Sequence, residues 1–138
     1  MPTITRWFIK SSFVCLGLAL LAGILLAVQP LFSLPVLNGF FPIYIHLFVF
    51  GWLTQLVFGV VFWMFPKYSS ARPRGSEPLA WWTYALLNAG LLLRLIAEPL
   101  NAAQPGAVVG WMLVLAAIVQ LSAGVAFVLN TWPRVKGK

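Results

Sequence analysis

Few side chains in this sequence could do chemistry, and three of them lie in apolar surroundings. His46 is the only histidine among 138 residues, and it lies inside a long apolar run. Arg94 and Glu98 lie four residues apart in a second apolar run, which places them one turn apart on one helix face. Ionisable groups are costly in hydrocarbon, so ionisable residues within apolar runs mark a candidate functional site. We therefore take His46, Arg94 and Glu98 as the candidate site.

An imidazole, a guanidinium and a carboxylate at one depth of a membrane suit the binding of haem. A histidine nitrogen is an axial ligand of haem iron, so His46 is the candidate metal ligand. The planar guanidinium of Arg94 matches the propionate carboxylates of haem. Glu98 would accept a hydrogen bond and so orient His46 or Arg94. Gly90, one turn before Arg94 on the same face, would leave room for a bulky group.

A structural interpretation of the same residues stays open. Arg94 and Glu98 would form an ion pair that reaches toward the membrane interface, and His46 would bond to a backbone carbonyl. Other chemistries have little support, because the sequence contains no CxxC, HExxH, P-loop or GxGxxG pattern. The single Cys15 cannot form an internal disulfide and is expected to be a small core residue. Whether the chain is an enzyme stays open.

The composition predicts an integral membrane protein. Hydrophobic residues make up 62% of the chain and charged residues only 8%, which is too apolar for a soluble domain. Four crossings of about 20 residues each would use more than half of the chain, so we expect one domain over residues 1–138. The net charge of +7 does not indicate nucleic acid, because the basic residues bracket the apolar runs and form no basic face.

The predicted fold class is an all-α, four-helix membrane bundle. Its helices are expected over about residues 8–28, 42–65, 79–98 and 108–129. Pro42 suits a first helical turn, Ser76-Glu77-Pro78 is a helix-start signal, and Pro99 is expected to end the third helix. A secretory signal is the competing interpretation of the run from Ser11 to Val28, but that run is long for a signal peptide.

The distribution of basic residues predicts the orientation of the bundle. Eight of the nine Lys and Arg residues lie in the N-terminal segment, the loop between the second and third helices, and the C-terminus. Arg94 is the ninth. Cytoplasmic segments carry the excess of basic residues, so both termini and the middle loop are expected in the cytoplasm, beneath a bacterial-type inner membrane.

The two halves of the chain resemble each other, which predicts a tandem duplication of a helical hairpin. Residues 22–26 (AGILL) match residues 89–93 (AGLLL), and the QL…GV…F pattern of residues 55–62 recurs at 120–127. Because each copy contains two helices, both copies begin on the same side of the membrane. The pseudo-two-fold axis that relates them would therefore lie along the membrane normal. Residues spaced by four then predict packing stripes: Gly51, Gln55 and Gly59, and likewise Ala116, Gln120 and Gly124. His46 falls opposite Gln55 on its helix.

The segment around His46 resembles a helix of known haem proteins. His46-Leu47-Phe48-Val49-Phe50-Gly51-Trp52, continuing to Phe58-Gly59-Val60 and Phe65-Pro66-Lys67, is similar to the H…FGW…GV…P(R/K) helix of NnrS-type membrane haem proteins. It is also similar to helices of subunit I in haem-copper oxidases and nitric oxide reductases, and Asn88-Ala89-Gly90 followed by Arg94 resembles the next helix of that group.

This resemblance covers about Tyr44 to Glu98 and implies b-type haem in a helical bundle, with His46 as its ligand. The chain also departs from those families, which are much longer and supply several histidines. A second axial histidine, or the histidines of a copper site, would have to come from outside this chain.

The leading functional prediction is a small respiratory-type membrane protein that binds haem b through His46, for electron transfer or for handling oxygen or nitric oxide. Its expected partners are the lipid bilayer and either a second copy, in a homodimer, or a larger membrane complex. One alternative is a haem-free structural or assembly subunit of a respiratory complex. The other alternative is a small transporter. The expected position of Glu98 argues against it, because Glu98 lies at a helix end, whereas the coupling sites of transporters usually lie near the membrane midplane.

Overall fold

Four long helical spans make up the structure. The computed structural model describes residues 1–31 and 35–135, and within these ranges it contains helices and turns but no strand. Each span is long and apolar enough to cross a membrane: Thr3–Leu31, Leu37–Met64, Glu77–Ala103 and Ala107–Arg134. The predicted all-α four-helix bundle is confirmed, and the chain is a multi-pass membrane protein. Lys136 and Lys138, which entered the prediction of orientation, lie outside the described residues.

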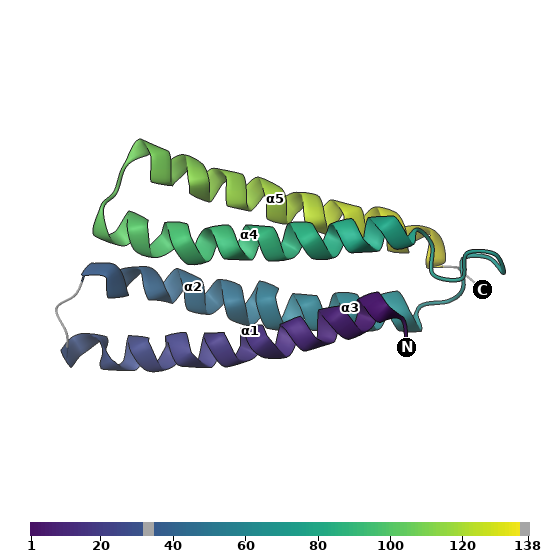
Figure 1. Cartoon of the computed structure of the whole chain (residues 1–138), viewed down its shortest axis with the longest axis horizontal. Coiled ribbons are helices and arrows are strands. Elements are labelled where there is room, and N and C mark those ends of the chain that lie inside the picture. The colour runs from purple at the N-terminus through teal and green to yellow at the C-terminus, as the bar shows by residue number, and fades with distance from the viewer. Residues whose placement is uncertain (32–34, 136–138) are drawn as a thin grey trace.

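The spans run antiparallel to their neighbours, as Figure 1 shows. The first contains α1 (Thr3–Val28), which is followed by the short turns η1 (Gln29–Leu31) and η2 (Pro35–Gly39). The second is one continuous helix in three parts: α2 (Phe40–His46), the π-helical η3 (Leu47–Thr54) and α3 (Gln55–Met64). The third and fourth are α4 (Glu77–Ala103) and α5 (Ala107–Thr131), which continues into the turn η4 (Trp132–Arg134).

The predicted end of the third helix at Pro99 is wrong, because α4 continues through this proline to Ala103. Proline removes one backbone donor and crowds the preceding turn, but membrane helices tolerate it where neighbouring groups compensate. Here the backbone of Gly39 packs directly on this turn. A Cβ at Gly39 would lie 2.7 Å from the Glu98 carbonyl oxygen and 2.8 Å from the Pro99 Cα. Glu98 therefore lies a full turn inside its helix.

The packing stripe predicted for the second span is buried against α1. Added Cβ atoms at Gly51 and Gly59 would lie 2.7 Å from the Cβ atoms of Cys15 and Phe8, respectively. Between them Gln55 is fully buried, donates to the Gly51 carbonyl at 2.9 Å and accepts a hydrogen bond from Asn88 at 2.8 Å. The free thiol of Cys15 is buried in this contact, as expected of a small core residue.

The corresponding stripe of α5 behaves differently. Ala116 and Gln120 are buried, but an added Cβ at Gly124 would meet no neighbour within 4 Å. The expectation that Gly90 leaves room for a bulky group is wrong, because α5 occupies this space: a Cβ at Gly90 would lie 2.5 Å from Gln120 Cγ. The two halves thus use equivalent glutamines in different surroundings, and the duplication about a common axis stays a prediction.

A buried arginine ties the end of the fourth span to the end of the second. Arg134 is 1% exposed and donates to the carbonyls of Pro66, Phe62 and Phe65 at 3.1, 3.0 and 2.7 Å. The last carbonyls of a helix have no partner within that helix, so this guanidinium caps α3 from outside. It thereby links the two hairpins.

We expect Arg134→Lys to lower the free energy of unfolding by about 2 kcal/mol, because a single ammonium cannot reproduce the three-nitrogen fork. Thermal unfolding of the purified protein in detergent measures the change, and the net charge is preserved. Arg72→Lys is the matched control, since Arg72 is exposed and takes part in hydrogen bonds through its backbone N–H and carbonyl. Equal melting temperatures for the two variants would contradict the capping role.

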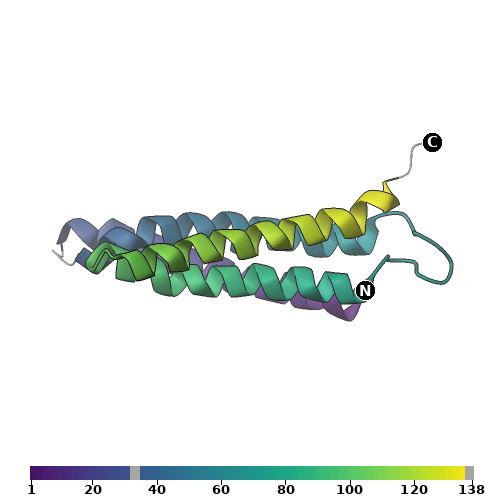
Figure 2. The same ribbon diagram turned by 90° about the horizontal axis from the view of Figure 1, so that it is seen from above.

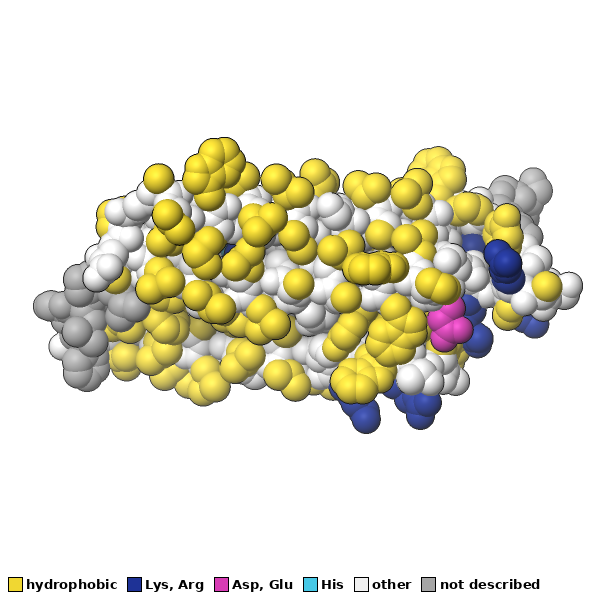
Figure 3. Space-filling model, turned by 45° about the horizontal axis from the view of Figure 1, so that its top comes forward, with side chains coloured by type: hydrophobic (Ala, Val, Ile, Leu, Met, Phe, Trp, Pro, Cys, Tyr) yellow, Lys and Arg dark blue, Asp and Glu magenta, His cyan; other side chains and the backbone are white. Residues whose placement is uncertain are grey.

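The surface of the bundle is apolar along its length and charged at one end. Figure 3 shows hydrophobic side chains covering the helices and basic side chains gathered near one end of the visible face. The N-terminus, the end of α5 and the loop between α3 and α4 lie at this same end in Figure 1. The arrangement suits four membrane crossings with the connecting loops on alternating sides.

Candidate functional site

His46 lies at the last position of α2, where the helix changes to its π-helical part. Its Nδ1 lies 2.8 Å from the carbonyl oxygen of Pro42, one turn earlier. A carbonyl oxygen only accepts, so Nδ1 carries the proton and Nε2 of the neutral ring keeps its lone pair. The ring also stacks on Phe50, with centroids 5.7 Å apart and an interplanar angle of 16°. This arrangement holds the imidazole in one orientation.

The sequence pattern did not predict the π-helical stretch that follows His46. The wider turns of η3 run from Leu47 to Thr54, and such segments occur frequently at functional sites. Phe50, the ring stacked on His46, belongs to this stretch. The local backbone therefore sets the orientation of the His46 ring.

His46 lines an open-sided groove of about 820 Å³ between the second and fourth spans. Phe50 and Phe58 line the same wall, Arg94 of α4 contributes to the floor, and α5 forms the opposite wall. Phe58 and Phe127 stack at a centroid distance of 3.7 Å and narrow the groove. In Figure 1 α4 lies between α5 and α2, and in Figure 2, seen from above, α5 lies over the seam between α4 and the second span. In Figure 1 it diverges from α2 toward the turn that joins α4 to α5.

The groove has the size and polarity of a ligand site. Ligand pockets of about 300–1,000 Å³ with mostly apolar walls and a few polar groups are typical for small molecules and cofactors. The polar side chains of this lining are His46, Arg94 and Gln120. The α5 wall runs from Ala117 to Leu129, which is about 18 Å of helix.

Arg94 is the centre of a small polar network in the floor of the groove. Its Nη1 donates to Glu98 at 2.8 Å, and its Nε donates to Gln120 Oε1 at 3.1 Å. The side chains of the ion pair are only 16% and 11% exposed. Because Glu98 balances the charge of Arg94, the pair is tolerable within an apolar segment.

Gln120 is a polar residue of the groove lining that the sequence did not indicate as part of the candidate site. It is 9% exposed, and its Nε2 has no hydrogen-bond partner among the described residues. Leaving a buried donor unpaired costs about 1–3 kcal/mol, so native proteins rarely keep one without a reason. Its repeat partner Gln55 suggested a packing role, and no local pattern distinguished the two glutamines.

The structure brings the predicted site residues together only in part. His46 and Arg94 line one groove, and Glu98 is joined to it through Arg94. Within the described ranges, His46 makes no hydrogen bond to either partner. The contacts of the structural interpretation are both present, namely the Arg94–Glu98 pair and the His46 bond to a carbonyl. A carbonyl bond at Nδ1 is also what orients a histidine that ligates a metal, so these contacts do not separate the two interpretations.

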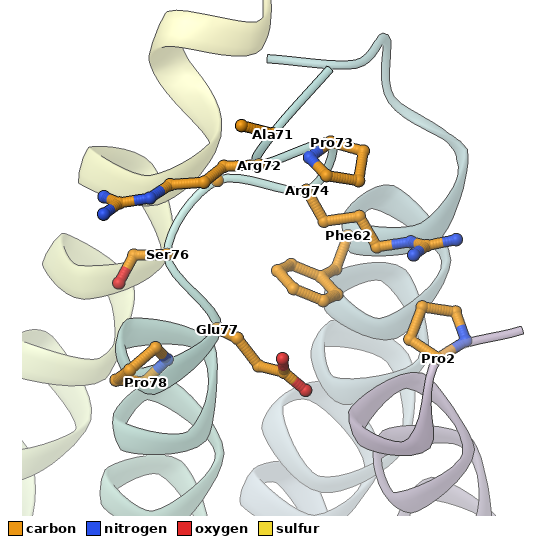
Figure 4. A pocket seen from close by; sticks show the side chains of 10 residues that line it. Pro2, Phe62, Ala71, Arg72, Pro73, Arg74, Ser76, Glu77 and Pro78 are labelled. Carbon is orange, nitrogen blue, oxygen red and sulfur yellow. The ribbon is translucent and has the colours of Figure 1, made fainter. Parts of the chain in front are cut away.

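A second depression, of about 450 Å³, lies at the basic end of the bundle. The loop residues Arg72 and Arg74 and the first residues of α4 line it, together with Pro2 and Phe62. In Figure 4 the two guanidinium groups point away from each other, and the Glu77 carboxylate lies apart from both. These side chains do not converge on a common point, so the depression is a weaker candidate than the groove.

No cluster of three or more His, Cys, Asp or Glu side chains that could hold a metal ion occurs in residues 1–31 and 35–135. Comparison of the chain with protein-family models, with curated proteins and with solved structures finds no match in any of the three.

Proposed function

We propose that this protein binds haem b in the groove between the second and fourth spans, with His46 as the axial ligand of the iron. The observation that carries the proposal is the hydrogen bond from His46 Nδ1 to the Pro42 carbonyl at 2.8 Å. It leaves Nε2 as the available nitrogen of a side chain that lines the groove. A histidine held in this way is pre-oriented as a metal ligand.

The other residues of the groove fit a porphyrin. Its walls are largely aliphatic and aromatic and would exclude water from the ring. Arg94 lies at the floor as a donor for oxygen atoms at the ligand's edge. Glu98 holds the Arg94 guanidinium in place at 2.8 Å. A bound haem would supply reversible one-electron chemistry and a coordination position for a diatomic gas.

The chain's own residues then have separate roles. His46 binds, Phe50 keeps the imidazole plane from rotating, and the Arg94–Glu98 pair provides polarity without net charge. We propose a role in electron transfer or in oxygen or nitric oxide handling in a bacterial-type inner membrane. The partner would be a second copy of this chain or a larger membrane complex. With one imidazole from this chain, a further ligand of the iron would come from such a partner or be a gas.

Absorption spectra of the purified protein, oxidised and reduced, test the proposal directly. A Soret band whose intensity corresponds to one haem per chain, or one per two chains, is the expected result. A purified, folded protein that binds no added haem would exclude it.

The orientation in the membrane belongs to the same proposal. Six basic residues of the described ranges lie outside the apolar parts of the spans at one end: Arg6, Lys10, Lys67, Arg72, Arg74 and Arg134. By the positive-inside rule this end faces the cytoplasm. Activity reporters fused after Lys138 and inserted at Ser70 should therefore both report a cytoplasmic location. Opposite locations for the two sites would mean that α4 and α5 do not both cross the membrane.

A further inference from the structure

Another groove, of about 430 Å³, lies between α1 and α4 and shares no residue with the groove of His46. Both helices begin at the basic end of the bundle and run in the same direction in Figure 1. The walls extend from Trp7 to Leu18 on α1 and from Tyr84 to Leu95 on α4. Each wall is about 16 Å long at the rise of an α-helix, which matches about half of a hydrocarbon core of roughly 30 Å. The groove therefore has the length of an acyl chain in one leaflet.

Contacts between the two helices and the second span close the base of this groove. The hydroxyl groups of Ser11 and Tyr84 form a hydrogen bond of 2.6 Å, and the Tyr84 ring meets Trp7 edge-on at a centroid distance of 6.4 Å. Leu47 and Leu91 line the groove and are only 2% and 3% exposed, so they form its base. The structure thus presents an apolar channel whose two walls are joined near the basic end.

The basic end of the channel adjoins a smaller polar depression. This depression has a volume of about 240 Å³ and is lined by Thr3, Arg6, Trp7 and Lys10. Trp7 and Lys10 line both the depression and the channel. The four residues are spaced by three and four along α1, so they lie on one helix face. A polar head region and an apolar tail region therefore follow each other along one side of α1.

The two cations of this head region have no carboxylate partner. Arg6 and Lys10 are exposed, and in the part of the chain that the structure describes neither forms an ion pair. Arg6 donates one hydrogen bond, to Thr3 Oγ1 at 3.2 Å. Glu77 lies at this end of the bundle but lines neither the depression nor the channel. Two uncompensated positive charges at the mouth of an apolar channel complement an amphiphile with an anionic head.

We propose that the channel between α1 and α4 holds one anionic phospholipid, with its phosphate against Arg6 and Lys10 and one acyl chain along the two helices. The lipid belongs to the leaflet at the basic end of the bundle. Trp7 lies at the junction of head and tail, where an indole ring suits the membrane interface. The inference does not depend on haem binding, because the two grooves have no residue in common.

Native mass spectrometry tests the proposal on the full chain, released from nanodiscs that contain equal amounts of phosphatidylglycerol and phosphatidylcholine. Both lipids have the same acyl chains and a phosphate, but only phosphatidylglycerol carries a net negative charge. We expect one phosphatidylglycerol to stay bound to each chain. Equal retention of the two lipids would overturn the proposal. So would a dimer without bound lipid, because a second copy of the chain would then cover this face.

A charge-matched pair of variants locates the binding. Arg6→Gln/Lys10→Gln should weaken the binding of phosphatidylglycerol about thirtyfold, or about fivefold for each basic group next to anionic lipid. Arg72→Gln/Arg74→Gln removes the same charge from exposed residues of the loop at the same end, and it should change the affinity less than twofold, roughly the effect of a distant charge in salt. Equal losses in the two variants would mean general attraction to the basic end and would overturn the site.

A second pair of variants tests the acyl-chain channel. Val14 lines the channel and is 64% exposed, so Val14→Trp should fill the channel without disturbing the packed core. Leu21→Trp is the control, because Leu21 is 58% exposed on the same helix but lies outside the channel. Val14→Trp should lose most of the bound phosphatidylglycerol, whereas Leu21→Trp should retain it, and both should melt like the wild type. Unchanged retention in Val14→Trp would show that no acyl chain lies in the channel and would contradict the proposal.

Discussion

Replacement of His46 by alanine is expected to abolish haem binding while the bundle still folds. The imidazole is the proposed iron ligand, so its loss should remove the Soret band after reconstitution with haem. The packing stripe of the second span lies on the other side of this helix, where Gly51, Gln55 and Gly59 are buried. His46 itself is only half-buried, so we expect the variant to keep the helical circular dichroism and melting behaviour of the wild type.

His46→Gly provides a matched control with a rescue. The smaller side chain leaves space in which added imidazole replaces the missing ring, so haem binding should return with imidazole concentration. Full haem retention in His46→Ala would rule out His46 as the ligand. Loss of haem without rescue, together with a lowered melting temperature, would point to a structural role of His46 instead.

The spin state of the iron then distinguishes the possible partners. A homodimer with haem on its axis would supply two His46 ligands, one from each chain, and bis-imidazole haem is low-spin. A single His46 leaves a position that binds gases and an iron that is often high-spin. Electron paramagnetic resonance of the oxidised protein, combined with its mass in detergent, reports which arrangement occurs.

Arg94→Met should be among the most destabilising single substitutions in the chain, by about 3 kcal/mol or more. It leaves Glu98, with a side chain 11% exposed, as an unpaired carboxylate in an apolar span. Removing one partner of a buried ion pair is strongly destabilising, because an uncompensated charge remains. It also removes the donor to Gln120 Oε1. Unfolding in detergent or the yield of folded protein measures the loss.

The double variant Arg94→Met/Glu98→Gln is the informative comparison. It removes both charges, so it should recover most of the stability lost in Arg94→Met, since the pair itself contributes little over neutral residues. Glu98→Gln alone leaves an unpaired guanidinium, and its loss of stability should lie between those of Arg94→Met and the double variant. If the stability losses of the two single variants added up to that of the double variant, the two charges would be hydrated and independent of each other.

The number and positions of the helices followed from local sequence. The four apolar runs predicted helices at about 8–28, 42–65, 79–98 and 108–129; the observed spans contain three of these ranges in full and the second as far as Met64. Hydropathy over about 20 residues is sufficient for this, because a chain in hydrocarbon must satisfy its backbone hydrogen bonds within each segment. The predicted end of the third helix was wrong: α4 continues through Pro99 to Ala103, and a distant residue, Gly39, packs on this turn.

The candidate site was predictable only as a set of residue types. An isolated histidine and an Arg–Glu pair stand out against an apolar background, and helix length places them at similar depths. The sequence also predicted different faces for His46 and Gln55 from the α-helical period, although the π-helical η3 that lies between the two residues was not predicted. The Arg94–Glu98 pair itself is a contact within one helix, four residues apart.

Only the tertiary structure decided what these side chains face. The packing of Gly90 on Gln120 sets how α5 lies against α4, and that contact gives Arg94 a second partner and leaves the Gln120 amide unpaired. The groove forms because α5 packs on α4 and meets the second span closely only toward the basic end, where Phe127 stacks on Phe58 and Arg134 caps α3. Hydropathy and helical period are properties of single segments, so they determined the membrane bundle. The shape of a groove between segments depends on side chains far apart in sequence, and no local pattern encodes their meeting.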